Sequence, residues 1–261
     1  MVPRDLLITA RQTGGDVEAL VPIPTRGRTF AARRRIRLSD TDSRGRLRLD
    51  AIARYLQDVA IDDVQETGWG LPDHLWFIRS IRIDVSSPFV EDGAVELVTW
   101  CSGLAAIAAG RRWSLRGDRG GRAEVDSVWI HLGPDERPAR LDGFDVYAEA
   151  TDGRAVSTKL LLPDPPEGGR AASWPLRVTD LDLHGHMNNA AYWQAVEERL
   201  VRRGPDPTTP VRALLDYRQP IDIDDEVRVV EFADGDAVGL ALVASGVVKA
   251  VARIEQLDPT G

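Results

Sequence analysis

Two stretches of this sequence are near copies of each other: RLSDTDSRG at positions 37–45 and RVTDLDLHG at positions 177–185. At an offset of 140 residues they share four identities in nine positions, with similar residues at two more. Both stretches run directly into a helical pattern. A repeat governs the fold, because each copy forms the same unit and the units pack against each other. The chain is therefore expected to contain two equivalent modules.

Each copy is followed by the periodicity of an amphipathic helix. In the first copy the helix is expected from Asp50, its candidate N-cap, to Gly68, its candidate C-cap. In the second copy Asn188 or Asn189 is the candidate cap, and the helix is expected to end before residue 204. The apolar residues on one face are Ile52, Leu56 and Val59 in the first helix and Trp193, Val196 and Leu200 in the second.

Strand-like segments separated by turns follow each helix. They are residues 75–85, 94–100, a stretch around Trp113 and 122–131 in the first copy, and 211–217, 226–232, 237–244 and 247–254 in the second. Each copy therefore reads as a strand, a long helix and about four antiparallel strands. The expected fold class is α+β, with the helix packed on one face of a curled antiparallel sheet. Two such sheets can pair edge to edge, which removes exposed edges, so one compact pseudo-dimer is expected.

The predicted organisation follows from the repeat. It comprises an N-terminal segment (1–28), a first module (29–161), a linker (162–172), a second module (173–256) and a tail (257–261). The linker is rich in proline and glycine, which disfavour both helix and strand.

Composition excludes several classes of protein. The net charge of −8 argues against a nucleic-acid partner. No run without Asp, Glu, Lys or Arg exceeds fourteen residues, whereas a membrane-spanning helix needs about 20 apolar residues. The single cysteine, Cys101, excludes an intrachain disulfide. The first 28 residues lack the pattern of a secretory signal, so a cytoplasmic location is expected.

Basic residues are concentrated in one part of the chain. Between Arg26 and Arg54 there are ten arginines and three aspartates. One interpretation is a docking surface for an acidic carrier protein or for the phosphates of coenzyme A. The alternative is a solvated strand face balanced by acidic residues of the first helix, namely Asp58, Asp62, Asp63 and Glu66.

The densest group of polar residues lies directly before the second helix and comprises Asp180, Asp182, His184, His186, Asn188 and Asn189. The amino end of a helix offers unpaired N–H groups to a developing oxyanion. A neutral imidazole can take a proton from water, and a carboxylate can orient it and stabilise the imidazolium. Asp182 and His186 are the predicted catalytic pair. Asn188 and Asn189 are the predicted substrate-binding residues, beside the carbonyl oxygen.

Two other interpretations of this segment stay open. The Asp-x-Asp-x-x-Gly frame occurs twice, so it can serve only to build a tight turn and start a helix, as Asp40, Asp42 and Gly45 would in the first copy. The histidines fit this interpretation less well, because Arg44 and Arg46 stand at the equivalent places. The third interpretation is a zinc or iron site built on the two histidines. Because no third histidine lies nearby, no metal and no cofactor are predicted.

These residues resemble the acyl-acyl-carrier-protein thioesterases, the plant Fat type and its bacterial relatives, which are two hotdog modules in one chain. The second module of that family carries Asp-x-Asn-x-His-Val-Asn-Asn before a helix with tyrosine, and here residues 182–192 read DLHGHMNNAAY. The segments similar to the family's first half are Leu56–Ala60, Val98–Trp100, Arg111–Trp113, Val128–Ile130 and Arg137–Leu141. The resemblance covers most of residues 30–254 and implies two tandem hotdog modules.

The resemblance also implies a set of catalytic residues. Asp182 and His186 fall on the family's catalytic aspartate and histidine. His184 falls on its catalytic asparagine and is the third predicted catalytic residue. Pro220 and Ile221 fall where the family has a catalytic glutamate followed by cysteine, so no equivalent general base is visible there.

The implied activity is hydrolysis of an acyl thioester, foremost of a fatty acyl-acyl-carrier-protein, with release of the free fatty acid. Water is expected to be activated by His186 with Asp182 behind it. The expected partner is an acyl carrier protein or a coenzyme A thioester, and the assembly a monomeric pseudo-dimer or a homodimer. The alternatives are an acyl-CoA thioesterase and a non-catalytic acyl-binding hotdog protein; no signature of a hotdog hydratase is found.

Overall fold

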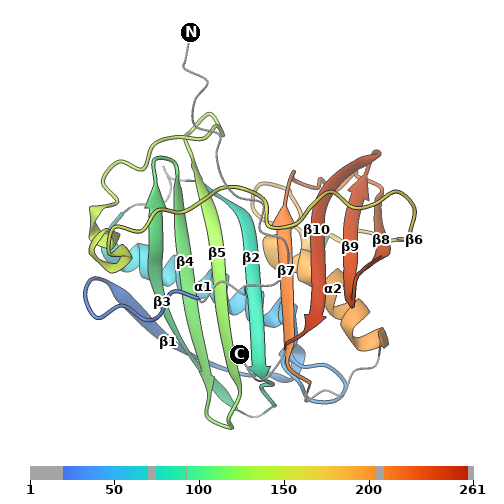
Figure 1. The fold of residues 1–261 in the computed structure, drawn as a ribbon, viewed down its shortest axis with the longest axis horizontal. Helices are drawn as coiled ribbons and strands as arrows, with labels where there is room; N and C mark the ends of the chain where they lie inside the picture. Colours follow the sequence, from blue (N-terminus) through green and yellow to red (C-terminus); the bar gives the residue numbers. More distant parts are fainter. Residues whose placement is uncertain (1–19, 70–74, 92, 204–208, 258–261) are drawn as a thin grey trace.

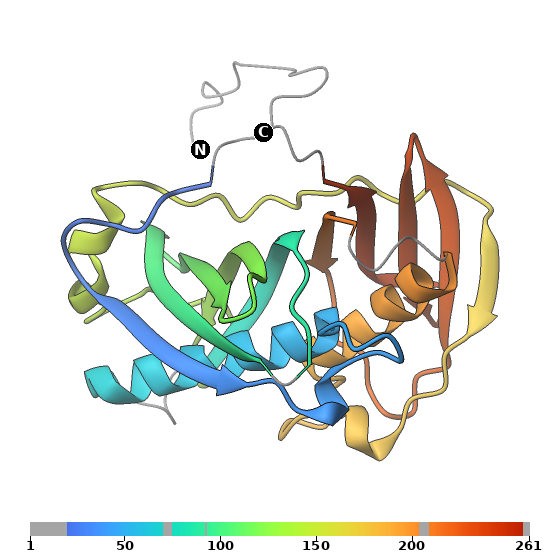
Figure 2. The ribbon, with the colours of Figure 1, turned by 90° about the horizontal axis from the view of Figure 1, so that it is seen from below.

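The computed structural model describes residues 20–69, 75–91, 93–203 and 209–257. Most of the predicted N-terminal segment, and the predicted tail beyond residue 257, lie outside the described residues. One antiparallel sheet of ten strands curves around two helices, which lie on its concave side (Figures 1 and 2). None of the helices in the described ranges is long and apolar enough to cross a membrane.

The elements follow the same order in both halves of the chain. The first half contains β1 (Thr29–Arg35), α1 (Leu49–Thr67), β2 (Leu75–Ser87), β3 (Ala94–Ala105), β4 (Ala108–Gly117) and β5 (Arg122–Leu132). The second half contains β6 (Arg170–Ser173), α2 (Asn189–Arg203), β7 (Val211–Tyr217), β8 (Val227–Asp234), β9 (Ala237–Ala244) and β10 (Val247–Gln256). Short 3-10 helices lie at Leu38–Asp40, Asp145–Tyr147, Glu149–Thr151 and Val178–Asp180. The α+β pseudo-dimer predicted from the repeat is therefore confirmed.

The strand order of the sheet reflects the repeat. Its strand order is β1-β3-β4-β5-β2-β7-β10-β9-β8-β6, so equivalent strands are met in the same succession from either edge. The halves join through β2 and β7, where Ser80 lies opposite Asp216, Arg82 opposite Leu214 and Asp84 opposite Arg212. Equivalent positions in these strands are 132 residues apart. A two-fold rotation therefore exchanges the Ser80–Asp216 pair with the Asp84–Arg212 pair and maps the Arg82–Leu214 pair onto itself. A local two-fold axis therefore passes between β2 and β7.

The helix ends follow from the repeated turn. Gly68 ends α1 as predicted, with a left-handed φ of 68° that glycine adopts without strain. The prediction that Asp50 caps α1 was wrong. The N-cap is Arg48, which is held extended by its N–H donating to the Asp40 carbonyl, so Asp50 falls inside the first turn. Asn188 caps α2, because its Oδ1 accepts the N–H of Ala190 at 2.9 Å.

One hydrophobic core fills the space between the helices and the sheet. It contains all six apolar helix residues predicted above, and it extends without a break across both halves. Burying a side chain of this size contributes about 1.5–3 kcal/mol. Since α1 and α2 also pack on each other, the two modules share one core.

Most of the basic block is paired. Ion pairs are formed by Arg28, Arg33, Arg34, Arg46, Arg48 and Arg54. Their partners include Asp62, Asp63 and Glu66 of α1. This pattern favours the interpretation of a strand face balanced by the acidic helix.

Candidate active site

The segment before α2 is a tight turn organised by one carboxylate. Asp182 Oδ1 accepts the backbone N–H groups of His184 at 2.9 Å and His186 at 3.2 Å. Gly185 adopts a φ of 79°, which allows the chain to reverse. The two histidine rings lie on the same turn with their centroids 6.5 Å apart. Asp182 therefore positions His186 through the backbone.

The first copy contains the same turn. Asp42 Oδ1 accepts the N–H groups of Arg44 at 2.9 Å and Arg46 at 3.0 Å, and Gly45 also has a φ of 79°. The repeated aspartate frame therefore builds the same turn in both copies. The chemical difference between the copies lies in the side chains that the turn presents.

The ring of His186 meets a carboxylate that the sequence did not single out. Its Nε2 lies 3.4 Å from Oδ1 of Asp222, and the backbones of these two residues form an isolated bridge. The side chains are 38% and 61% exposed, so water reaches both. Asp222 stands two residues after Pro220, in a segment whose only sequence signal was a turn. It supplies a carboxylate beside the imidazole.

The amino end of α2 is held by two further groups. Asn188 caps it, as described above, and the Tyr217 hydroxyl donates to the carbonyl of Asn189 at 2.8 Å. Trp193 Nε1 donates to the same hydroxyl at 3.1 Å. Burial raises the pKa of Tyr217 well above its ordinary value, which keeps the hydroxyl protonated. Within the described ranges the N–H of Asn189 has no acceptor, so this helix end is open.

The equivalent helix end in the first copy is closed. Glu197 of α2 reaches across the two-fold axis, and its Oε2 accepts the N–H of Leu49 at 3.0 Å. Its other oxygen binds the guanidinium of Arg46, which also pairs with Asp42. Glu197 is buried, and this burial raises its pKa. The arrangement leaves no exposed imidazole and no free N–H at this position.

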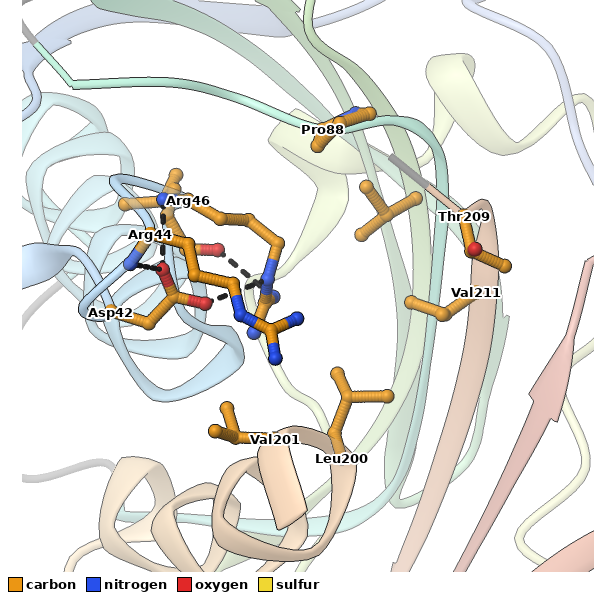
Figure 3. Close-up of a pocket in the computed structure, with 10 residues that line it drawn as sticks. Asp42, Arg44, Arg46, Pro88, Leu200, Val201, Thr209 and Val211 are labelled. Carbon is orange, nitrogen blue, oxygen red and sulfur yellow. Dashed lines mark hydrogen bonds and ion pairs between the residues drawn. The ribbon is translucent and has the colours of Figure 1, made fainter. Parts of the chain in front are cut away.

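Two hollows lie near the repeated turns. The smaller one, of about 30 Å³, belongs to the first copy, where Arg44 and Arg46 face apolar side chains such as Leu200 (Figure 3). This volume suits about two water molecules. The larger, of about 880 Å³, is lined by Ser39, Asp40, Arg48, Asp50, Arg54, Trp174, Arg177, Thr179, Asp180, Gln194, Glu197, Glu198 and Val201. His186 lines neither of them.

The described residues contain no group of three His, Cys, Asp or Glu side chains that could hold a metal ion. His184 is exposed, and its ring stacks loosely on that of His186. The metal-site interpretation therefore gains no support from the described part of the chain.

Comparison with known proteins identifies the family. Models of the acyl-ACP thioesterase N-terminal and C-terminal domains match residues 27–144 and 165–254. The chain belongs to the acyl-ACP thioesterase family. It is accordingly a thioester hydrolase, and the resemblance seen in the sequence is confirmed.

Relatives and solved structures agree with this assignment. An uncharacterized protein of Mycobacterium tuberculosis is 31% identical over 92% of this chain and 96% of its own length. The oleoyl-acyl carrier protein thioesterase 1 of Arabidopsis thaliana is 26% identical over 69% of this chain and 57% of its own length. The 12:0-ACP thioesterase from Umbellularia californica superposes with a TM-score of 0.70 at 17% identity, over 88% of this chain and 97% of that one. An acyl-ACP thioesterase from Bacteroides thetaiotaomicron gives 0.69 at 14% identity, over 88% and 98%. The predicted double hotdog fold is thereby confirmed.

Proposed function

We propose that this thioesterase hydrolyses fatty acyl-acyl-carrier-protein and releases the free fatty acid, with His186 activating the attacking water. The observation that carries the proposal is the position of His186, three residues before the open amino end of α2 and beside the Asp222 carboxylate. The preference for an acyl-carrier-protein thioester is supported by the names of the plant relatives. Acyl-CoA is the second candidate carrier, because the same ester chemistry applies to both.

The proposed reaction uses groups of this chain alone. His186 takes a proton from water, and the hydroxide adds to the thioester carbonyl. The resulting oxyanion accepts the N–H of Asn189 at the positive end of the α2 dipole. Collapse of this intermediate breaks the carbon–sulfur bond, and the thiolate takes the proton back from the imidazolium. Asp222 stabilises the imidazolium in between, while Asp182 and Asn188 hold the turn and the helix end.

His184 is exposed on the same turn and stays a predicted third catalytic residue. Asp182 likewise stays in the predicted set, with the backbone hydrogen bonds to His184 and His186 as its observed contacts.

The test is release of free thiol from acyl thioesters of graded length, on carrier protein and on coenzyme A. His186→Ala is expected to lower kcat at least about 100-fold, the usual contribution of a positioned general base. Leu183→Ala on the same turn is the matched control, because this side chain is fully exposed, and it should keep full activity. Full turnover by a folded His186→Ala variant would remove the assignment. If the wild-type protein binds but never cleaves these thioesters, the non-catalytic alternative holds.

A further inference from the structure

The two-fold relation between the halves extends from the sheet to the turns and helices. In the first copy the N–H of Arg48 donates to the Asp40 carbonyl at 3.0 Å, and in the second the N–H of Asn188 donates to the Asp180 carbonyl at 2.8 Å. The bridge between Thr41 and Leu47 likewise recurs between residues 181 and 187. Residues of the turns and helix starts therefore correspond at the offset of 140, in position as well as in sequence.

One contact between the modules has no counterpart among these paired hydrogen bonds. Glu197, in the middle of α2, reaches the first residue of α1, Leu49, and the turn residue Arg46. Under the two-fold relation Leu49 corresponds to Asn189 and Arg46 to His186. Glu197 itself corresponds to Gln57, in the middle of α1.

We infer that Gln57, contributed by the first module, faces the amino end of α2 and positions the thioester for attack at His186. This inference rests on the proposed function. Gln57 is half-buried, and its amide makes no side-chain hydrogen bond to the rest of the described chain. Its N–H₂ group is a second hydrogen-bond donor, beside the N–H of Asn189, for the carbonyl oxygen of the thioester.

The chemistry of the two equivalent positions explains why the site forms on one side. The Glu197 carboxylate can only accept hydrogen bonds, so it occupies the helix N–H and neutralises Arg46. The neutral carboxamide of Gln57 is a weaker acceptor for the N–H of Asn189 than a carboxylate would be. Its N–H₂ group can also donate a hydrogen bond to the thioester carbonyl. The glutamine therefore leaves the helix end accessible to the substrate.

The placement is tested by Gln57→Glu, which should reproduce the closure seen in the first copy. The new carboxylate is expected to accept the N–H of Asn189 and to move the amide proton resonance of Asn189 downfield in ¹H–¹⁵N spectra. Gln65→Glu, two turns further along α1 and exposed, is the matched control and should leave that resonance in place. An unchanged Asn189 resonance in Gln57→Glu overturns the placement, whatever the activity of the protein.

The positioning role is tested by kinetics. Gln57→Ala is expected to lower kcat/KM by about 100- to 1,000-fold, mainly through kcat, as for loss of one oxyanion donor. Gln57→Asn, which keeps a carboxamide, should recover part of this loss, and thermal unfolding checks that each variant is folded. Full kcat/KM in folded Gln57→Ala overturns the role. If the Asn189 resonance moves in Gln57→Glu but wild-type protein cleaves no acyl thioester, the placement stands and the proposed function fails.

Discussion

The two copies of the turn place different side chains at one equivalent position, Arg46 in the first and His186 in the second. Arg46 forms ion pairs with Asp42 and Glu197. Because an arginine keeps its charge throughout the physiological pH range, these pairs persist across that range. A histidine can gain and lose a proton near neutral pH, and His186 is partly exposed beside Asp222. The same backbone frame therefore holds an ion pair in one half and a group suited to acid–base chemistry in the other.

Asp222 provides a prediction at this scale. Asp222→Asn removes the charge beside Nε2 of His186 and should lower kcat about tenfold, because the imidazolium formed during the reaction loses its partner. Stability should change by less than about 0.5 kcal/mol, as expected for an exposed side chain. Asp224→Asn, also exposed in the same turn, is the control for a general charge effect. Equal rates for both variants and the wild type would exclude Asp222 from the reaction.

At the scale of elements, the connection between the halves is tied to the outer face of the sheet. The later part of this connection, after the 3-10 helix Glu149–Thr151, crosses the face opposite the helices (Figure 1). There the N–H of Leu162 donates to Oδ2 of Asp216 on β7 at 2.7 Å, while Arg218 donates to the carbonyls of Leu162 and Pro163. Asp216 is completely buried, and its Oδ1 has no hydrogen-bond partner among the described residues. Burial raises the pKa of this carboxyl.

The raised pKa of Asp216 predicts a pH-dependent stability difference. A buried acid with a raised pKa favours the folded state least when it is ionised, so wild-type stability falls as pH rises from about 3.9, the ordinary value, through the folded pKa. Asp216→Asn lacks this loss and can still accept the N–H of Leu162. Across that pH window the free energy of unfolding of the variant should rise relative to that of the wild type. Above the window the difference between them should stay constant. Urea unfolding at several pH values measures this, with Asp236→Asn, exposed in the turn between β8 and β9, as the control.

At the scale of the whole molecule, the two-fold axis relates Asp216 to Asp84, and the two carboxyls behave oppositely. Asp84 lies at the junction of β2 and β7, where Arg82 and Arg212 both bind it. Burial alone raises the pKa of Asp84, but the two guanidinium groups outweigh it and the net shift is downward. Asp216 instead faces Ser80 across the strands. The junction is therefore held by an ion cluster on one side of the axis.

This junction gives the prediction for the whole fold. Asp84→Asn should destabilise the protein by about 3 kcal/mol at neutral pH, because two largely buried arginines lose the carboxylate they share and Arg212 keeps only Glu255, at 3.6 Å. A lowered folded pKa contributes stability above the unfolded value of about 3.9 that is lost as pH falls through the folded pKa. The gap between variant and wild type should therefore close in acid. A gap that stays constant down to acid unfolding would contradict the assigned role.

The sequence by itself determined the two modules, their helices and most of their strands, since a repeat and hydrophobic periodicity are local properties. β7 and β9 have the bounds predicted from strand-like segments between turns. It also determined the family, because the motif around His186 is contiguous. The tertiary structure alone decided that Asp222 meets the imidazole, that Glu197 closes one helix end and that Asp50 is not a cap. Those contacts depend on how distant segments pack around the two-fold axis, and no local pattern encodes that packing.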